Sequence, residues 1–382
     1  MNSTSLIMLS LKKNGIAAIL LAFVGGLFVL KYSARATELQ LFVAASYFVG
    51  YVLLSIWVCG VDLKHSIFSN DRILLILTAA TVVIIAGILV TLLPEESRVG
   101  RLPALNESIE RLLRGQLPWG ASMQNRPSGF PFLFVLALPS YYLGNLGFLE
   151  VLGILLFALS AIKYNYTSGN GWLCLIGLLA LPTFYYELLV RSELFFNMSV
   201  FIFLIVVSER YLSPSKIDLW FAALALVFGL CLSTRLITIM ILVAYATYKF
   251  RRSILKGLIF VSISLLIFGL TIVPFLWWDA RAFVLQGPFS VQMSYLPPTV
   301  AFLFFLSAFF IGWKSLTLRA LFLFLGTLLF GIVLTSFLLT SAASNYVSAV
   351  IHDGFDIGYF IFSVPFLLLS FERITIPGGG AA

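Results

Sequence analysis

Acidic and basic side chains gather in a few short turns of a chain that is otherwise apolar. Glu95 and Glu96 directly follow an apolar run, and Glu187, Arg191 and Glu193 crowd the turn between two others. A carboxylate beside an apolar wall can act as a general base, and an arginine can pair with a phosphate. We therefore expect Glu95, Glu96 and Glu193 to be catalytic. Arg191 and Glu187 are expected to bind substrate.

Each of these groups also has a purely structural interpretation. Glu95 and Glu96 could form a solvated helix end, and the charges at 187–193 could pair with one another. Arg235 is a lone basic residue with no acid within ten residues along the chain. Such an arginine at the level of lipid headgroups favours a phosphate ligand, and the alternative is a side chain that merely extends to the membrane interface.

Loop 94–129 is the longest polar stretch, and it contains enough apolar residues to be ordered. The spacing predicts a helix over 104–114 that lies on a membrane surface. Its apolar face is formed by Leu105, Ile109, Leu112 and Leu113. Gly115 ends this helix, and a second surface helix is expected over 130–143.

Two further residues of this loop are candidates for substrate binding. Glu107, inside the first surface helix, is also a rival for the general base, and Arg126 opens the turn before the second helix. Loop 279–298 is aromatic and rich in amides, which suits a sugar or a polar headgroup. The acidic stretch 352–356 has one His and two Asp, but their spacing matches no strict metal-ligand pattern. A divalent metal ion therefore stays open as a cofactor, and no other is indicated.

The composition shows what must position these residues. Of the 382 residues, 61% are hydrophobic and 10% are charged, which excludes a soluble globular protein. A membrane span takes about 20 apolar residues, so the chain predicts an all-α, polytopic membrane protein of about twelve transmembrane helices. The expected spans are 15–30, 39–60, 73–93, 147–162, 171–186, 194–208, 217–233, 236–250, 257–278, 299–313, 320–340 and 357–371.

The basic residues decide the orientation of these spans. If 130–143 does not cross, the side that holds both termini carries 14 of the 24 basic residues and 5 of the 16 acidic ones. The positive-inside rule then places both termini in the cytoplasm, with loop 94–146 and all the candidate residues on the opposite face. We expect a multi-pass protein of the bacterial inner membrane. The net charge of +8 follows from this bias, so we expect no nucleic-acid partner.

These features together resemble the GT-C superfamily of integral-membrane glycosyltransferases. The similar parts are Glu95-Glu96 after a span, the helix 104–114, the turns around Pro118 and Pro127, Arg191-Ser192-Glu193, and Thr234-Arg235. The family usually has aspartate at both acidic positions, where this chain has glutamate. The resemblance covers about 73–300.

The resemblance implies a transferase that moves a sugar from a polyprenyl-phosphate donor to a lipid, glycan or protein acceptor on the extracytoplasmic face, with inversion. The expected organisation is a catalytic membrane module in 73–300, C-terminal spans in 301–376 and a tail in 377–382, with two N-terminal spans in 1–72 that precede the first span usual in the family. The main alternative is a twelve-span transporter or lipid flippase. A non-catalytic subunit that binds lipid or supports assembly is a third possibility.

Overall fold

The computed structural model describes residues 3–34, 36–60, 71–93, 101–119, 127–164, 171–294, 296–351 and 354–372. Every element in this part of the chain is a helix, which confirms the all-α class. In chain order the elements are α1 (Ser3–Ser33), α2 (Gln40–Gly60), α3 (Asp71–Leu92), α4 (Arg101–Leu113), α5 (Pro131–Tyr142), α6 (Gly147–Tyr164), α7 (Gly171–Leu179), α8 (Pro182–Val190), α9 (Leu194–Tyr211), α10 (Leu219–Leu232), α11 (Thr238–Lys249), α12 (Ile254–Leu285), α13 (Pro288–Met293), α14 (Pro298–Lys314), α15 (Leu318–Ser344), α16 (Tyr346–Val350), the 3-10 helix η2 (Ile357–Phe362) and α17 (Val364–Leu369).

Seven helices in the described ranges are long and apolar enough to cross a membrane, and the bent pair α7 and α8 would make an eighth span. They support a polytopic membrane protein. Four further predicted spans coincide with shorter apolar helices: α10, α11 and α14, which have 14, 12 and 17 residues, and the stretch Ile357–Leu369 formed by η2 and α17. Since a hydrocarbon core is matched by about 20 helical residues, the count of twelve crossings stays a prediction.

The predicted span 171–186 is not one straight helix. α7 ends at Leu179, α8 begins at Pro182, and the two are bent by 68°. Proline has no N–H to donate and disfavours helical geometry in the residue before it, which explains the break. Pro182 was visible in the sequence, but the continuous apolar run around it favoured a single span.

The predicted loop 279–298 is largely helical. α12 runs on to Leu285 across a break at Asp279, whose φ of −159° is not helical. The Asp279 carboxylate accepts a hydrogen bond from the Ala282 N–H at 2.8 Å, so it caps the helical turn that follows. α13 then occupies most of the remaining stretch.

Both helices expected in loop 94–146 are present, as α4 and α5. α4 ends at Gly115, whose φ of +69° is the left-handed conformation that glycine tolerates best. Leu105 and Ile109 are buried, whereas Leu113 is 48% exposed. The buried residues of α4 therefore lie nearer the start of the helix than predicted, since Leu102 and Ala104 are also buried.

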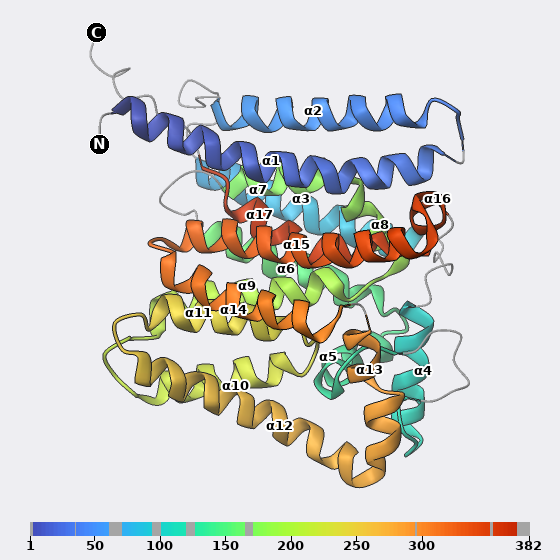
Figure 1. Cartoon of the computed structure of the whole chain (residues 1–382), viewed down its shortest axis with the longest axis vertical. Coiled ribbons are helices and arrows are strands. Elements are labelled where there is room, and N and C mark those ends of the chain that lie inside the picture. The colour runs from blue at the N-terminus through green and yellow to red at the C-terminus, as the bar shows by residue number, and fades with distance from the viewer. Residues whose placement is uncertain are drawn as a thin grey trace. The chain divides into compact units, whose positions relative to one another are not determined.

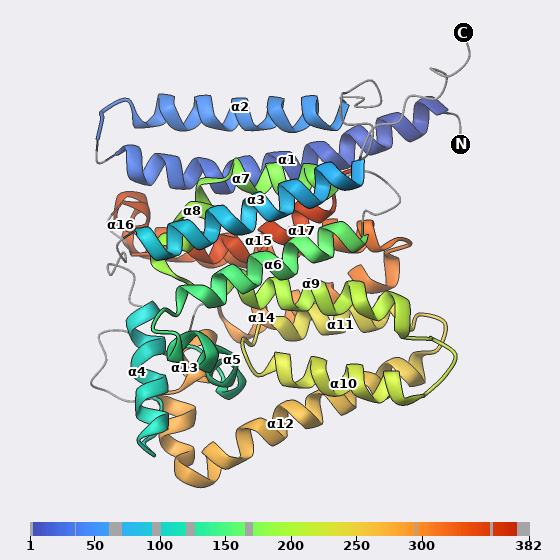
Figure 2. The same ribbon diagram turned by 180° about the vertical axis from the view of Figure 1, so that it is seen from behind.

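The chain divides into two compact units, each assembled from separated segments. The first comprises Met1–Ile84, Ala158–Tyr186 and Thr317–Ala382, and the second comprises Ile85–Phe157 and Glu187–Leu316. In the first unit, α1 and α2 lie side by side along their length (Figures 1 and 2). α15 packs on α17, where a Cβ at Gly326 would meet Leu367.

The second unit contains Arg191, Glu193 and Arg235. Its long helices pair as α10 with α12 and α11 with α14, and α9 packs on α10 and α11. Glycines permit two of the close approaches: a Cβ at Gly229 would meet the Ser264 carbonyl, and one at Gly312 would meet the Ala244 carbonyl. Close contact through small residues is a common way to pack helices in membranes. α4 runs crosswise to these helices (Figure 1).

Candidate functional site

Arg235 contacts two segments that are distant along the chain. It lies in the turn between α10 and α11, and it donates hydrogen bonds to the Glu193 carboxylate and to the Ser128 hydroxyl. The ion pair is dry, since the Arg235 and Glu193 side chains are 4% and 5% exposed. The lone arginine of the sequence therefore has an acidic partner, contrary to its expected isolation, because folding brings together residues 42 positions apart.

The start of α5 is held on the same turn. The Phe130 N–H donates to the Thr234 carbonyl at 3.2 Å, and the Leu133 N–H donates to the Ser233 carbonyl at 3.2 Å. The first N–H groups of a helix have no acceptor one turn back within that helix. The Thr234 carbonyl supplies one for Phe130, and the Leu133 N–H is shared between the Ser233 carbonyl and the Phe130 carbonyl, the latter at 3.0 Å. The turn before α5 is thereby fixed beside Arg235.

Gln292 of α13 also contacts this turn and the segment before α5. Its side-chain oxygen accepts from the Leu236 N–H at 2.8 Å, and its side-chain nitrogen donates to the Ser128 carbonyl. We call Arg235, Glu193, Ser128 and Gln292 the Arg235 cluster. The sequence predicted that loop 279–298 would carry useful amides, but it gave no means of choosing Gln292.

A second buried ion pair lies at the other end of the same α8–α9 turn. Arg101, the first residue of α4, has its guanidinium 3.6 Å from the Glu187 carboxylate and donates to the Ser192 hydroxyl at 2.8 Å. Glu187 is 1% exposed. We call Arg101, Glu187 and Ser192 the Arg101 cluster. Its chemistry resembles that of the Arg235 cluster, with one arginine between a carboxylate and a serine hydroxyl.

Arg191 links these clusters through its backbone. Its φ of +48° is left-handed, and the next N–H, of Ser192, donates to the Glu187 carbonyl at 3.1 Å, which closes the end of α8. The Arg191 guanidinium donates to the Val90 carbonyl at 3.2 Å and to the Leu93 carbonyl at 3.5 Å. These are end carbonyls of α3, where a cation is favourable. Arg191, which the sequence predicts to bind a phosphate, therefore has a structural role here.

Two buried polar residues escaped the sequence analysis. Glu150, in the first turn of α6, is 1% exposed, faces the Phe196 N–H near the start of α9, and interacts electrostatically with Glu187. Asn197 is also 1% exposed, and neither atom of its amide group has a hydrogen-bond partner among the described residues. Glu150 was overlooked because an acid in the first turn of a helix is ordinarily explained by the helix dipole.

The remaining predicted site residues are Glu95, Glu96, Arg126 and Glu107. Glu95, Glu96 and Arg126 lie outside the described residues. Glu107 is half-buried on α4, six residues after Arg101, which is about 9 Å along a helix axis. The arrangement thus joins Glu193 with Arg235, while Glu187 lies in α8 and Arg191 in the turn that follows it.

Metal binding receives no support from the part of the chain that is described. No group of three or more His, Cys, Asp and Glu side chains there is arranged to hold a metal ion. Cys59, Cys174 and Cys231 are all buried, and none of the three is in a disulfide. His352 and Asp353 lie outside the described residues, and Asp356 accepts from the Gly358 N–H at 2.9 Å as the cap of η2.

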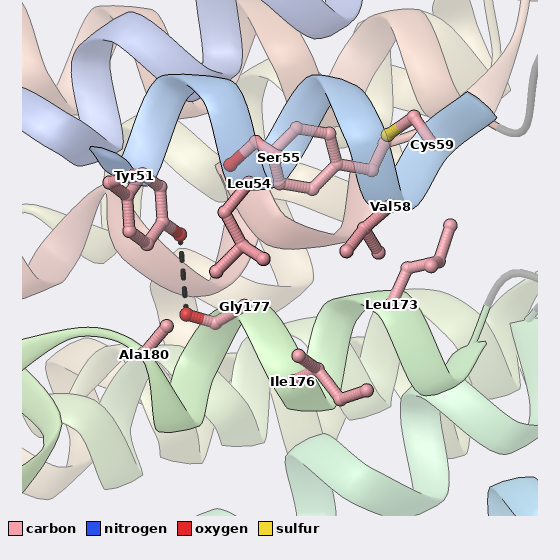
Figure 3. Close-up of a pocket in the computed structure, with 10 residues that line it drawn as sticks. Tyr51, Leu54, Ser55, Val58, Cys59, Leu173, Ile176, Gly177 and Ala180 are labelled. Carbon is pink, nitrogen blue, oxygen red and sulfur yellow. Dashed lines mark hydrogen bonds between the residues drawn. The ribbon is translucent and has the colours of Figure 1, made fainter. Parts of the chain in front are cut away.

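An apolar pocket lies in the first unit, between α2 and α7 (Figure 3). Leu54, Val58 and Ile176 line it, and the Tyr51 hydroxyl donates to the Gly177 carbonyl at 3.2 Å at one end. None of the predicted site residues is among those that line it. Its surface suits hydrocarbon, and the titratable or hydroxyl side chains that line it are Tyr51, Ser55 and Cys59.

The two arginine clusters define the chemistry that the second unit can perform. Each holds a fixed guanidinium, which can pair with an oxyanion, next to a carboxylate that can accept a proton. The low polarity of the surroundings strengthens both interactions. No family model, no curated protein and no solved structure matches the chain.

Proposed function

We propose that the protein is a membrane glycosyltransferase that moves a sugar from a polyprenyl-phosphate donor to an acceptor hydroxyl. One observation supports this most directly: Arg235 is fixed in a buried site beside Glu193 and Ser128, at the ends of apolar helices. A phosphate attached to a lipid would reach such a site with its chain between the helices. The guanidinium would pair with it through parallel N–H···O bonds.

In the proposed reaction a carboxylate takes the proton of the acceptor hydroxyl while its oxygen attacks C1 of the sugar. The bond from C1 to the phosphate oxygen breaks on the opposite side, so the configuration inverts. Arg235 stabilises the charge that grows on the departing phosphate. Glu193 is the base in contact with this arginine, and Glu95 and Glu96 remain the alternatives that the resemblance implies.

The proposal includes the topology expected from charge. Twelve crossings, cytoplasmic termini, and α4 and α5 lying in the plane of the outer membrane surface would open both arginine clusters to a common space away from the cytosol. The Arg101 cluster supports a role for α4 as a cover, because Arg101 attaches the start of that helix to Ser192 and Glu187.

The proposal is tested with purified full-length protein and labelled prenyl-phosphate sugars. Arg235→Gln should reduce transfer by about a hundredfold or more, the usual loss when one charge-stabilising group is removed. Glu193→Gln, Glu95→Gln and Glu96→Gln are compared separately, and a general base is worth about a hundredfold or more. Arg252→Gln, an exposed residue between α11 and α12, is the control. Unchanged transfer in all three glutamate variants would exclude a carboxylate base at these positions.

Transport is the second candidate, and a specific observation favours it. Transporters place ionisable groups inside their spans, and Glu150 and Asn197 are polar residues buried within α6 and α9. Uptake of a lipid-linked or soluble sugar into proteoliposomes separates the two functions. Uptake that survives Arg235→Gln and Glu193→Gln, but is lost in Glu150→Gln, would support transport over transfer.

A further inference from the structure

The outer edge of the Arg235 guanidinium is already occupied. Nη2 donates to the Glu193 carboxylate and Nη1 donates to the Ser128 hydroxyl. These two nitrogens form an edge with which an arginine can grasp an oxyanion bidentately. A phosphate that used this edge would need the position of the Glu193 carboxylate.

Burial makes the phosphate and the Glu193 carboxylate mutually exclusive partners of Arg235. Arg235 and Glu193 are 3% and 4% exposed, so little water is present to solvate either charge alone. A buried charge that loses its partner carries a large penalty, which means that Glu193 leaves Arg235 only if another anion arrives. A phosphate brings the same sign of charge and similar acceptor oxygens.

The rest of the cluster is built to stay in place during such an exchange. Ser128 is held through its carbonyl by Gln292, and Gln292 also accepts from the Leu236 N–H. Phe130 and Leu133 bind the same turn through backbone hydrogen bonds. Glu193, by contrast, makes no side-chain hydrogen bond to the start of its own helix, α9. Its carboxylate can therefore leave without unwinding that terminus.

We propose that Glu193 and the donor phosphate are alternative partners of Arg235, so that the donor releases the carboxylate that acts next. This inference rests on the proposed function. Before the donor binds, Glu193 is neutralised by Arg235 and is a poor proton acceptor. Once phosphate takes the guanidinium, the freed carboxylate accepts the acceptor's proton as the oxygen–C1 bond forms. The electrons of the broken C1–O bond remain on the phosphate.

The cycle balances without a further reactant. The acceptor gains the sugar and loses a proton, the prenyl phosphate leaves with its charge, and Glu193 carries the proton. When prenyl phosphate dissociates, Glu193 gives the proton to water and pairs with Arg235 again. The exchange thus makes the base available only while a donor or its phosphate product is bound.

Binding of a soluble prenyl phosphate tests the exchange without any need for turnover. Farnesyl phosphate is titrated into the full-length protein in lipid nanodiscs, with farnesol and inorganic phosphate as separate probes for the lipid and anion parts. Glu193→Gln removes the competing charge, so farnesyl phosphate should bind about tenfold more tightly than to the wild type, a difference of about 1.4 kcal/mol. Arg235→Gln should abolish this binding.

The matched control is Glu209→Gln, on the same helix. Glu209 forms its own ion pair with Lys249 at 3.0 Å, and its loss should leave the affinity for farnesyl phosphate unchanged. Glu193→Asp keeps the charge but shortens the side chain, and it should give an intermediate gain in affinity. This second variant serves if Glu193→Gln does not fold.

Equal or weaker binding in both Glu193 variants, in protein that still unfolds cooperatively, would overturn the exchange. The exchange would also be overturned if Arg235→Gln bound farnesyl phosphate with the affinity of the wild type. If the predicted gain appears but no sugar is transferred, the exchange stands and the glycosyltransferase proposal fails. If sugar is transferred but no gain appears, the proposed function stands and the exchange fails.

Discussion

At the scale of single residues, the Glu193 and Arg235 pair carries an energetic cost. Two charges have been moved into a nearly dry site, with side chains 4% and 5% exposed. Their attraction roughly offsets the loss of hydration, so the pair itself adds little net stability. Removal of only one partner is different, because the other charge then remains buried alone.

A double-mutant cycle measures this asymmetry. Arg235→Met alone should lower the free energy of unfolding by about 3–5 kcal/mol, whereas Glu193→Leu with Arg235→Met should recover at least half of that loss. Thermal or denaturant unfolding in mild detergent provides the measurement. Strictly additive losses would show that the two side chains do not interact in the folded protein.

Arg191 offers a second test, because its backbone is in the left-handed conformation. Arg191→Gly and Arg191→Ala lose the same contacts to the end carbonyls of α3. At a φ of +48°, alanine is strained and glycine is not. The Gly variant should therefore be more stable by about 1 kcal/mol, which reverses the usual order in a helix. An alanine variant as stable as the glycine one would contradict the assigned geometry.

The candidate residues could be selected from the sequence, but most of their contacts could not. The turns at 187–193 and 234–235 stood out because short turns between apolar runs rarely need several charges. The contact of Arg235 with Glu193 depends on how α9, α10 and α11 pack, which no local pattern encodes. Glu150 was missed because its position in a first turn already has an ordinary explanation.

At the scale of elements, the start of α4 has a buried polar contact in addition to its buried apolar face. Arg101 is 10% exposed and donates to Ser192 beside Glu187, whereas Arg114, directly after the last residue of the helix, is 71% exposed and pairs with Glu110. Arg101→Gln should detach the start of α4, and Arg114→Gln should change little, since exposed pairs are worth about 0–1 kcal/mol.

Hydrogen exchange of the α4 amides reports this difference. Protection should fall by about tenfold or more in Arg101→Gln and stay within a factor of about three in Arg114→Gln, in line with those interaction energies. Equal protection in the two variants would mean that Arg101 does not anchor the helix.

The positions of the elements were largely predictable, and their internal breaks were less so. Every predicted span falls on helical segments because apolar runs are long and their borders are polar, but 171–186 is divided between α7 and α8 and 357–371 between η2 and α17. Pro182 and Asp279 are local signals for the bend and for the cap. Hydropathy averaged over a long apolar run does not register such single residues. α10 and α11 have 14 and 12 residues, which is shorter than a full membrane span, so hydropathy alone does not decide whether they cross.

At the scale of the whole molecule, sidedness decides whether the arginine clusters can meet an extracytoplasmic substrate. Leu143 and Leu255 are 71% and 70% exposed, and the three native cysteines are buried. An impermeant maleimide should label Leu143→Cys in intact cells, and Leu255→Cys only after the membrane is opened. If α5 crosses the membrane instead, the two results are exchanged.

The most direct test of the account is transfer of labelled sugar by the purified chain from prenyl-phosphate donors, with wild type, Arg235→Gln and Arg252→Gln measured side by side. We expect transfer by the wild type and by Arg252→Gln, and a loss of about a hundredfold or more in Arg235→Gln. Equal transfer by all three proteins, or none by the wild type across the donors tested, would contradict the assignment of Arg235 as the phosphate-binding group of a glycosyltransferase.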